Sequence, residues 1–308
     1  MTLVSFDRAE VIMRRFGPSG EQFLRELPDR LAQRAKQWHL VLGPPYPVGI
    51  GGYMVQAERP DGSAAVLKLS PTGAEQARAN QLEVLMLHRW SGHGAVLLLD
   101  AELAAGALLM ERCIPGTTLD TLPDEEMVRI GCRLASMLHT EPTSEDLELI
   151  PVALDSVADG TRRFSAVMAE LGESLSPDVW RVVKESHEYL VADRSHLVVC
   201  HGDLNPGNVL AAQRLPWLAI DPLPRVADPA YDAASLVWAR RPWLLAQPDA
   251  QAVLAHRLDV AAGELLVDPE RIRAWTLVRL VGVLADRHTW GGFDGSVLIR
   301  VAELLMSL

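Results

Sequence analysis

Hydrophobic and polar positions follow two different patterns along the chain, and the change comes near residues 113–117. Over residues 1–37 apolar side chains recur at loosely helical spacing, which predicts an amphipathic helical segment. A further helix is predicted over residues 74–90, so the first part of the chain is a small sheet with one helix. Short apolar runs bounded by Pro, Gly and Asp predict its strands at residues 38–42, 53–58, 64–69, 95–99 and 107–111.

Helical periodicity dominates after Pro115-Gly116, where Met127, Ile130 and Leu134 form part of one apolar face. A short polar segment rich in proline, residues 198–232, interrupts the helices. Further helices are predicted at residues 155–171, 177–193, 248–264, 269–287 and 296–307. The two patterns predict an α+β chain of two lobes, namely residues 1–113, including the N-terminal helical segment 1–37, and residues 114–308.

Composition narrows the classes of function. The chain of 308 residues has a formal net charge of −11, which argues against a nucleic-acid-binding surface and suits a cationic ligand. It has no apolar run of about 18 residues and begins without the apolar stretch of a signal peptide, so membrane insertion and secretion are not predicted. Three cysteines without CxxC spacing suggest a reduced, cytoplasmic setting without a metal cluster. No feature indicates a protein partner.

The chemistry-bearing segment is the polar loop that follows the apolar run Val198-Val199-Cys200. It contains Asp203 and Asn208, and a second apolar run ends at Asp221. An antiparallel hairpin would bring these three side chains to one end of a small sheet. Phosphoryl transfer needs such a set, because magnesium prefers oxygen ligands and a further carboxylate must orient the attacking hydroxyl and accept its proton. The alternative is a polar turn whose side chains satisfy backbone donors.

The same residues carry a family resemblance. His201-Gly202-Asp203 with Asn208 and Ile220-Asp221 resembles the aminoglycoside phosphotransferases and their protein-kinase-like relatives. Gly202 favours the small-molecule branch, since arginine is usual there in protein kinases. Within that branch the chain is similar to the aminoglycoside/hydroxyurea antibiotic-resistance kinases, the streptomycin 6-phosphotransferase group, over about residues 38–292. Residues 228–232 and 268–292 add to the likeness.

The resemblance implies a two-lobed protein-kinase-like fold and a role for each motif residue. Asp203 would be the catalytic base, and Asn208 and Asp221 would bind magnesium. His201 would brace the loop, the alternative being a metal ligand or nucleophile.

In the first lobe, Lys68 would contact the phosphates of ATP, paired with an acid on the following helix. Glu83 is the first choice and Glu75 the second; the plain alternative for Lys68 is an exposed lysine at a sheet edge. The cluster Gly49, Gly51 and Gly52 would approach the phosphates, although it matches neither G-x-G-x-x-G nor a Walker loop.

The segment that joins the two lobes would present its main chain to adenine. Glu111 and Cys113 are the residues expected to do so, with a reactive thiol at Cys113 as the rival interpretation.

The acceptor would lie beside Asp203, against acidic and aromatic side chains of the helical lobe. Asp286 and Trp290 are the candidate substrate residues. Arg225 would contact a phosphate or pair with Asp228, and Asp232 would cap a helix that begins at residue 233. Other side chains available for this wall are Asp228, Asp232, Glu264, Asp294, Tyr231, Trp238 and Trp275.

The predicted function is therefore ATP- and Mg²⁺-dependent phosphorylation of a hydroxyl on a small cationic molecule, with streptomycin or another aminoglycoside as first choice. A kinase for hydroxyurea or another small metabolite is the alternative within the enzymes. A protein kinase is disfavoured because no Asp-Phe-Gly or Ala-Pro-Glu motif is present. A non-catalytic nucleotide- or antibiotic-binding protein is the alternative from another class.

Overall fold

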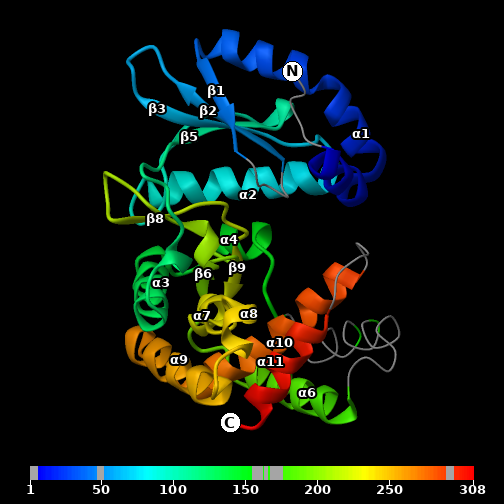
Figure 1. Cartoon of the computed structure of the whole chain (residues 1–308), viewed down its shortest axis with the longest axis vertical. Helices are drawn as coiled ribbons and strands as arrows, with labels where there is room; N and C mark the ends of the chain where they lie inside the picture. Colours follow the sequence, from blue (N-terminus) through cyan, green and yellow to red (C-terminus); the bar gives the residue numbers. More distant parts are fainter. Residues whose placement is uncertain (1–5, 47–51, 155–161, 163–165, 167–175, 289–294) are drawn as a thin grey trace. The chain divides into compact units, whose positions relative to one another are not determined.

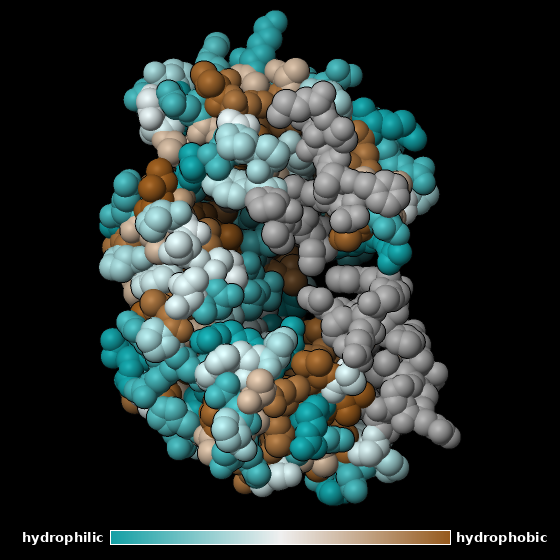
Figure 2. All heavy atoms as spheres, viewed as in Figure 1, coloured by the Kyte–Doolittle hydropathy of each residue, from teal (hydrophilic) through white to brown (hydrophobic). Residues whose placement is uncertain are grey.

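The computed structural model describes residues 6–46, 52–154, 162, 166, 176–288 and 295–308. Two units divide the chain: a sheet unit, Met1–Gly116 with Ala212–Arg214, and a helical unit, Thr117–Ala211 with Leu215–Leu308 (Figure 1). Among the described residues, none of the helices has the length and apolar composition needed to cross a bilayer. Hydrophilic side chains are spread widely over the visible face, with hydrophobic ones in smaller patches (Figure 2).

The sheet unit contains an antiparallel five-stranded sheet of order β1-β2-β3-β5-β4. Its strands are β1 (Val41–Pro45), β2 (Tyr53–Glu58), β3 (Ala64–Leu69), β4 (Leu98–Glu102) and β5 (Ala107–Glu111). The predicted bounds of β2, β3 and β5 are confirmed, whereas β1 and β4 begin three residues later than predicted. Trp38 and Leu40 donate their backbone N–H groups to the end of the preceding helix, and Val96 is buried without strand pairing. Apolar character alone therefore predicted both strand starts too early.

Helix α1 (Phe6–Gln37) packs on one face of this sheet. Its Phe23 and Leu27 share a buried apolar cluster with alternate residues of β2 and β3, including Val55 and Leu67. Because side chains alternate along a strand, Lys68 lies on the opposite face. That face is the one that α2 (Ala74–Trp90) reaches through its Glu83. The predicted N-terminal helical segment therefore supports the sheet.

A short piece of chain from the second half of the sequence completes the sheet unit. Arg214 donates to the Glu111 carboxylate at 2.9–3.2 Å and to the carbonyl oxygens of Gly92 at 2.6 Å and Ala95 at 2.9 Å. Glu111 also accepts the backbone N–H of Leu97 at 3.0 Å. The Glu111 side chain is thus a structural anchor.

The helical unit is built around α10, which packs against α6, α7, α9 and α11. Its strands form two short antiparallel pairs, β6 with β9 and β7 with β8. The predicted helix 155–171 lies largely outside the described residues, and the other predicted helices agree with α6, α9, α10 and α11 to within a few residues. The elements are α3 (Asp124–Leu138), α4 (Ser144–Leu149), α6 (Pro177–Ala192), β6 (Val198–Cys200), β7 (Val209–Ala211), β8 (Trp217–Ala219), β9 (Arg225–Ala227), α7 (Ala230–Val237), α8 (Arg241–Leu245), α9 (Ala250–Leu265), α10 (Pro269–His288) and α11 (Ser296–Met306).

Candidate active site

The β7–β8 hairpin places two of the predicted ligands at the same end of its ladder. Val209 pairs with Ala219 in register, so Asn208 precedes the paired region and Asp221 follows it. The backbone N–H of Ile220 donates to the Asn208 carbonyl oxygen at 2.9 Å, which extends the hairpin by one further contact. Asp221 is exposed and has a φ of 55°, in the left-handed region that Asp adopts more readily than most side-chain-bearing residues.

Asp203 is held by two asparagine side chains. Asn208 Nδ2 donates to Asp203 Oδ2 at 3.0 Å and to its main-chain oxygen at 2.9 Å, while Asn205 Nδ2 donates to Asp203 Oδ1 at 3.1 Å. Each carboxylate oxygen thus has a fixed donor. Because Nδ2 of Asn208 faces Asp203, its amide oxygen is directed away from that carboxylate.

Burial raises the pKa of the Asp203 carboxyl, and the positive charge of Arg279 is the main effect that opposes this rise. A raised pKa makes the carboxylate a better proton acceptor for a hydroxyl group. The group is therefore both oriented and made more basic by its surroundings.

Gly202 is required by the backbone path of this loop. Its φ is 88°, and a Cβ atom at this position would lie 1.7 Å from the carbonyl oxygen of Leu223. A side chain here would displace either the loop or the segment after Asp221.

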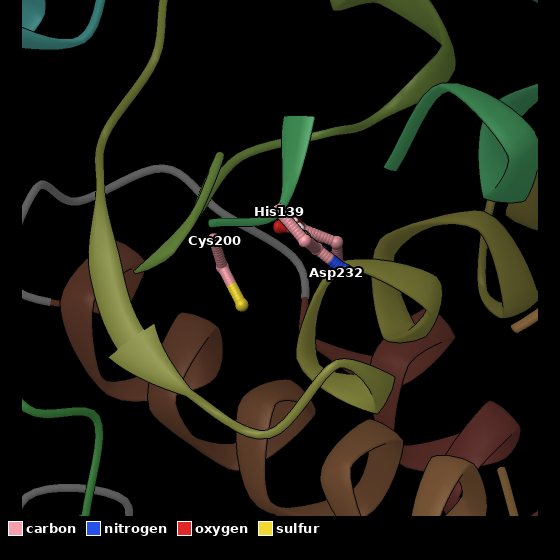
Figure 3. Close-up of side chains that lie close together, drawn as sticks. All are labelled: His139, Cys200 and Asp232. Carbon is pink, nitrogen blue, oxygen red and sulfur yellow. Dashed lines mark hydrogen bonds and ion pairs between the residues drawn. The ribbon is translucent and has the colours of Figure 1, made fainter. Parts of the chain in front are cut away.

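Asp232 on α7 anchors the loop that contains Gly202 and Asp203. Its carboxylate accepts the backbone N–H groups of His201 at 2.9 Å and Gly202 at 2.8 Å, and His139 Nε2 lies 3.1 Å from it (Figure 3). Burial acts to raise the pKa of Asp232, but the hydrogen bond and charge of His139 and the loop contacts together lower it. The expected capping role was wrong, because α7 already begins at Ala230 and this fully buried carboxylate faces the loop.

His139, Cys200 and Asp232 have potential ligand atoms within 4.8 Å of one another (Figure 3). The Cys200 thiol donates to the Asp228 carbonyl oxygen at 3.6 Å, and burial raises the pKa of this thiol well above its usual range. A metal ion would need the Cys200 thiolate, which the raised pKa disfavours, and the oxygens of Asp232, which already accept backbone N–H groups. The cluster therefore acts as a hydrogen-bonded network that supports the loop.

His201 is fully buried, with Nε2 3.1 Å from the Ile220 carbonyl oxygen and Nδ1 3.3 Å from the backbone nitrogen of Asp203. Burial lowers the pKa of its imidazole, which favours the neutral form. Both ring nitrogens face backbone groups, so the geometry favours a brace over a metal ligand or nucleophile.

In the sheet unit, Lys68 on β3 and Glu83 on α2 form the predicted ion pair. Lys68 Nζ lies 2.9 and 2.8 Å from the two carboxylate oxygens, and the side chains are only 6% and 4% exposed. Glu75, the second choice, is exposed in the first turn of α2. The alternative of a sheet-edge lysine was wrong, because β3 is the central strand.

The remaining nucleotide-side predictions have different outcomes. Gly49 and Gly51 lie outside the described residues. At Gly52 a Cβ atom would lie 2.3 Å from the Leu69 carbonyl oxygen, so close packing against β3 requires this glycine. Burial raises the pKa of the Cys113 thiol to about 12, which argues against the reactive-thiol interpretation. The expectation that Glu111 and Cys113 meet adenine through their main chains stays a prediction.

The two candidate substrate residues are not characterised by the structure. Trp290 and the side chain of Asp286 lie outside the described residues, as does Asp294.

Other expected members of the acceptor wall have structural partners instead. Asp228 accepts the Ala230 N–H at 2.8 Å and pairs with Arg271 at 2.6 Å, so the alternative in which Arg225 pairs with Asp228 was wrong. Arg225 donates to the Pro224 carbonyl oxygen.

Glu264 binds two arginines of α3, Arg129 at 2.6 Å and Arg133 at 2.8 Å. Trp238 and Trp275 are buried, and Tyr231 packs edge-to-face on Trp275 at 4.9 Å between ring centroids. These side chains therefore stabilise the helical unit.

Sequence reasoning missed Arg279 of α10. Its guanidinium donates to the carbonyl oxygens of Gly202 at 3.0 Å and Tyr231 at 2.7 Å. One arginine among several in the same helix gives no sequence signal for such a contact.

The family model of the aminoglycoside/hydroxyurea antibiotic resistance kinases matches residues 37–288, most of the chain. The chain belongs to this family. It is therefore a phosphotransferase, and the predicted resemblance and enzyme class are confirmed.

Similar proteins agree with this membership. The chain is 31% identical to a streptomycin 6-kinase of Streptomyces griseus over 97% of its own length and 94% of that protein. It is also 31% identical to a hydroxyurea phosphotransferase of Kitasatospora aureofaciens, over 96% and 84% of the two chains. These similarities support a small-molecule kinase.

The solved structure of choline kinase LicA from Streptococcus pneumoniae shares the fold. It has a TM-score of 0.61 and 14% identity, and the match covers 92% of this chain and all of that one. The predicted protein-kinase-like fold is thereby confirmed.

Proposed function

We propose that the protein transfers the γ-phosphoryl group of ATP to a hydroxyl of a small cationic molecule, with streptomycin as first choice. The observation that carries the proposal is the Asp203 carboxylate, fixed by Asn205 and Asn208 on a loop that Asp232 holds in place.

In the proposed reaction Asp203 orients the acceptor hydroxyl and accepts its proton. The hydroxyl oxygen forms the new bond to the γ-phosphorus, the bond from that phosphorus to the β–γ bridging oxygen breaks, and ADP carries away the electron pair. The raised pKa of Asp203 suits this proton transfer. Positioning and charge neutralisation supply most of the catalysis, because the transition state is loose.

Asn208 and Asp221 would hold magnesium. They offer an amide oxygen directed away from Asp203 and a carboxylate at the same end of the hairpin, which are the oxygen donors that this hard cation prefers. Mg²⁺ bound there would neutralise charge on the nucleotide phosphates.

Lys68 would bind the same phosphates from the sheet unit. Glu83 holds the ammonium group in place and compensates its charge in a buried position. Gly52, with Gly49 and Gly51, would belong to the loop near the phosphates, and the main chains of Glu111 and Cys113 would meet adenine.

Two observations favour streptomycin among acceptors. The streptomycin 6-kinase of Streptomyces griseus matches almost the whole chain, and the net charge of −11 suits a molecule that carries guanidinium groups. Hydroxyurea is the second candidate, because the hydroxyurea phosphotransferase is equally similar in identity.

The test is ADP release with ATP and magnesium across a panel of streptomycin, 2-deoxystreptamine aminoglycosides, hydroxyurea and simple amino alcohols. We expect streptomycin to raise the rate and to gain the mass of one phosphoryl group. Asp203→Asn should lose turnover while it keeps nucleotide affinity, whereas the exposed Asp259→Asn should behave as wild type. Wild-type turnover in Asp203→Asn, or silence across the panel, would contradict the proposal.

A further inference from the structure

A guanidinium group from α10 contacts the peptide group that leads into Asp203. Arg279 Nη2 donates to the Gly202 carbonyl oxygen at 3.0 Å, and Nη1 donates to the Tyr231 carbonyl oxygen at 2.7 Å. The guanidinium carbon lies 4.1 Å from the centroid of the Tyr231 ring and 5.7 Å from that of Trp238. Two hydrogen bonds and stacking on aromatic rings therefore fix its position.

Gly202 is consequently held on both sides. Asp232 accepts its N–H at 2.8 Å, and Arg279 donates to its carbonyl oxygen. The Gly202 carbonyl and the Asp203 N–H belong to one planar peptide unit. The plane that sets the direction of the Asp203 side chain is thus anchored by a residue far away in the sequence.

We propose that Arg279 is a positioning residue of the phosphotransfer reaction, which acts on Asp203 through the Gly202 carbonyl group. This inference rests on the proposed function, because it requires Asp203 to meet the acceptor hydroxyl. Arg279 itself does not touch the reacting atoms in this scheme; it maintains the direction from which Asp203 approaches them.

The two carbonyl contacts explain why arginine is used. A planar guanidinium presents several N–H donors in a fixed fork and bonds two separate carbonyl oxygens while it stacks on a ring. A lysine ammonium is a point charge on a flexible stem and cannot reproduce this geometry. Arg279→Lys should therefore keep the charge but lose part of the positioning.

Arg271 provides a matched control on the same helix. It lies eight residues earlier, pairs with Asp228 at 2.6 Å, donates to the Asp193 carbonyl oxygen at 3.1 Å and stacks on Tyr189 at 5.6 Å. Its loss removes comparable hydrogen bonds and stacking from the helical unit without a change at Gly202.

The experiment compares Arg279→Met, Arg279→Lys and Arg271→Met in the full chain, with steady-state kinetics normalised to the folded fraction. We expect kcat of Arg279→Met to fall about 10²-fold, as for a misplacement of about 1 Å, with KM for ATP little changed. Arg279→Lys should lie between this variant and wild type, and Arg271→Met should keep the wild-type kcat although it melts earlier.

Chemical rescue gives a second readout that keeps the test valid if Arg279→Met folds poorly. Millimolar guanidinium chloride should restore part of the kcat of Arg279→Ala and none of any loss in Arg271→Ala. Equal kcat in wild type and Arg279→Met, or equal losses in the Arg279 and Arg271 variants without rescue, would overturn the positioning role alone. An inactive wild-type chain would overturn the proposed function and this role together.

Discussion

Removal of Glu83 alone should destabilise the sheet unit strongly, because it leaves the Lys68 ammonium buried without its carboxylate. Both carboxylate oxygens lie within 2.9 Å of Nζ, and the side chains are 6% and 4% exposed, so solvent cannot replace the lost partner. Breaking a buried pair from one side costs about 3–5 kcal/mol, whereas replacing both partners with apolar residues is close to neutral. We therefore expect Glu83→Leu to lose about 3–5 kcal/mol and the double variant Lys68→Met/Glu83→Leu to recover to within about 1 kcal/mol of wild type.

The double variant separates stability from function. It should fold but lose about 10²-fold or more in kcat/KM for ATP, because the substitution removes the cation that we propose to bind the phosphates. The assay is urea unfolding followed by tryptophan fluorescence, with phosphotransfer measured on the same preparations. The exposed pair Arg14–Glu10 supplies the control, since Glu10→Gln should change the free energy of unfolding by no more than about 1 kcal/mol.

Two results would refute this reasoning. A double variant as unstable as Glu83→Leu would show that the buried charge of Lys68 is not the cause of the instability of Glu83→Leu. A double variant with wild-type turnover would show that Lys68 does not serve the nucleotide.

Three further predictions follow from the site. Gly202→Ala should lower the free energy of unfolding by about 2–4 kcal/mol, because the added methyl group overpacks against Leu223 and alanine disfavours the positive φ of this position. Urea unfolding measures this change, and an unchanged midpoint would contradict the prediction. The three free cysteines are buried, and burial raises the pKa of the Cys113 thiol to about 12. A disulfide reagent at pH 8 should therefore react with no thiol in the native chain and with three thiols in guanidinium chloride. Rapid labelling of the native chain would contradict this packing. The pKa of Asp232 is lower in the folded state than in the unfolded one, so its contribution to stability is present above the unfolded pKa of about 3.9 and is lost as pH falls through the folded value. Asp232→Asn should therefore flatten the acidic part of the curve of melting temperature against pH. A curve identical to that of the wild type would contradict the assignment.

Local patterns in the sequence were sufficient for much of the fold and for part of the site. Short apolar runs at Tyr53–Glu58 and Ala64–Leu69, separated by turn residues, identified two strands, and each of these strands buries every second residue against α1. The need of a buried cation for a partner, together with the family resemblance, pointed to an acid on the following helix, and Glu83 is that acid.

Long-range backbone contacts were beyond such reasoning. Asp232 reaches the N–H groups of His201 and Gly202 from another element, and Arg279 reaches Gly202 from the helix α10. Nothing in the residues around either side chain specifies a backbone partner so distant in sequence. Strand starts failed for a related reason, since residues such as Val96 are apolar because they are buried, whether or not they pair.

The contribution of Arg214 to the sheet unit limits how such a chain can be divided or recombined. Chain connectivity passes between the two units at three points, after residues 116, 211 and 214. A fragment that ends at residue 116 would lack the guanidinium that binds Glu111, Gly92 and Ala95. A chimera of two homologues with a single crossover at residue 116 would therefore combine the sheet unit of one protein with residues 212–214 of the other. Such chimeras should fold only when residues 212–214 and residues 1–116 come from the same parent.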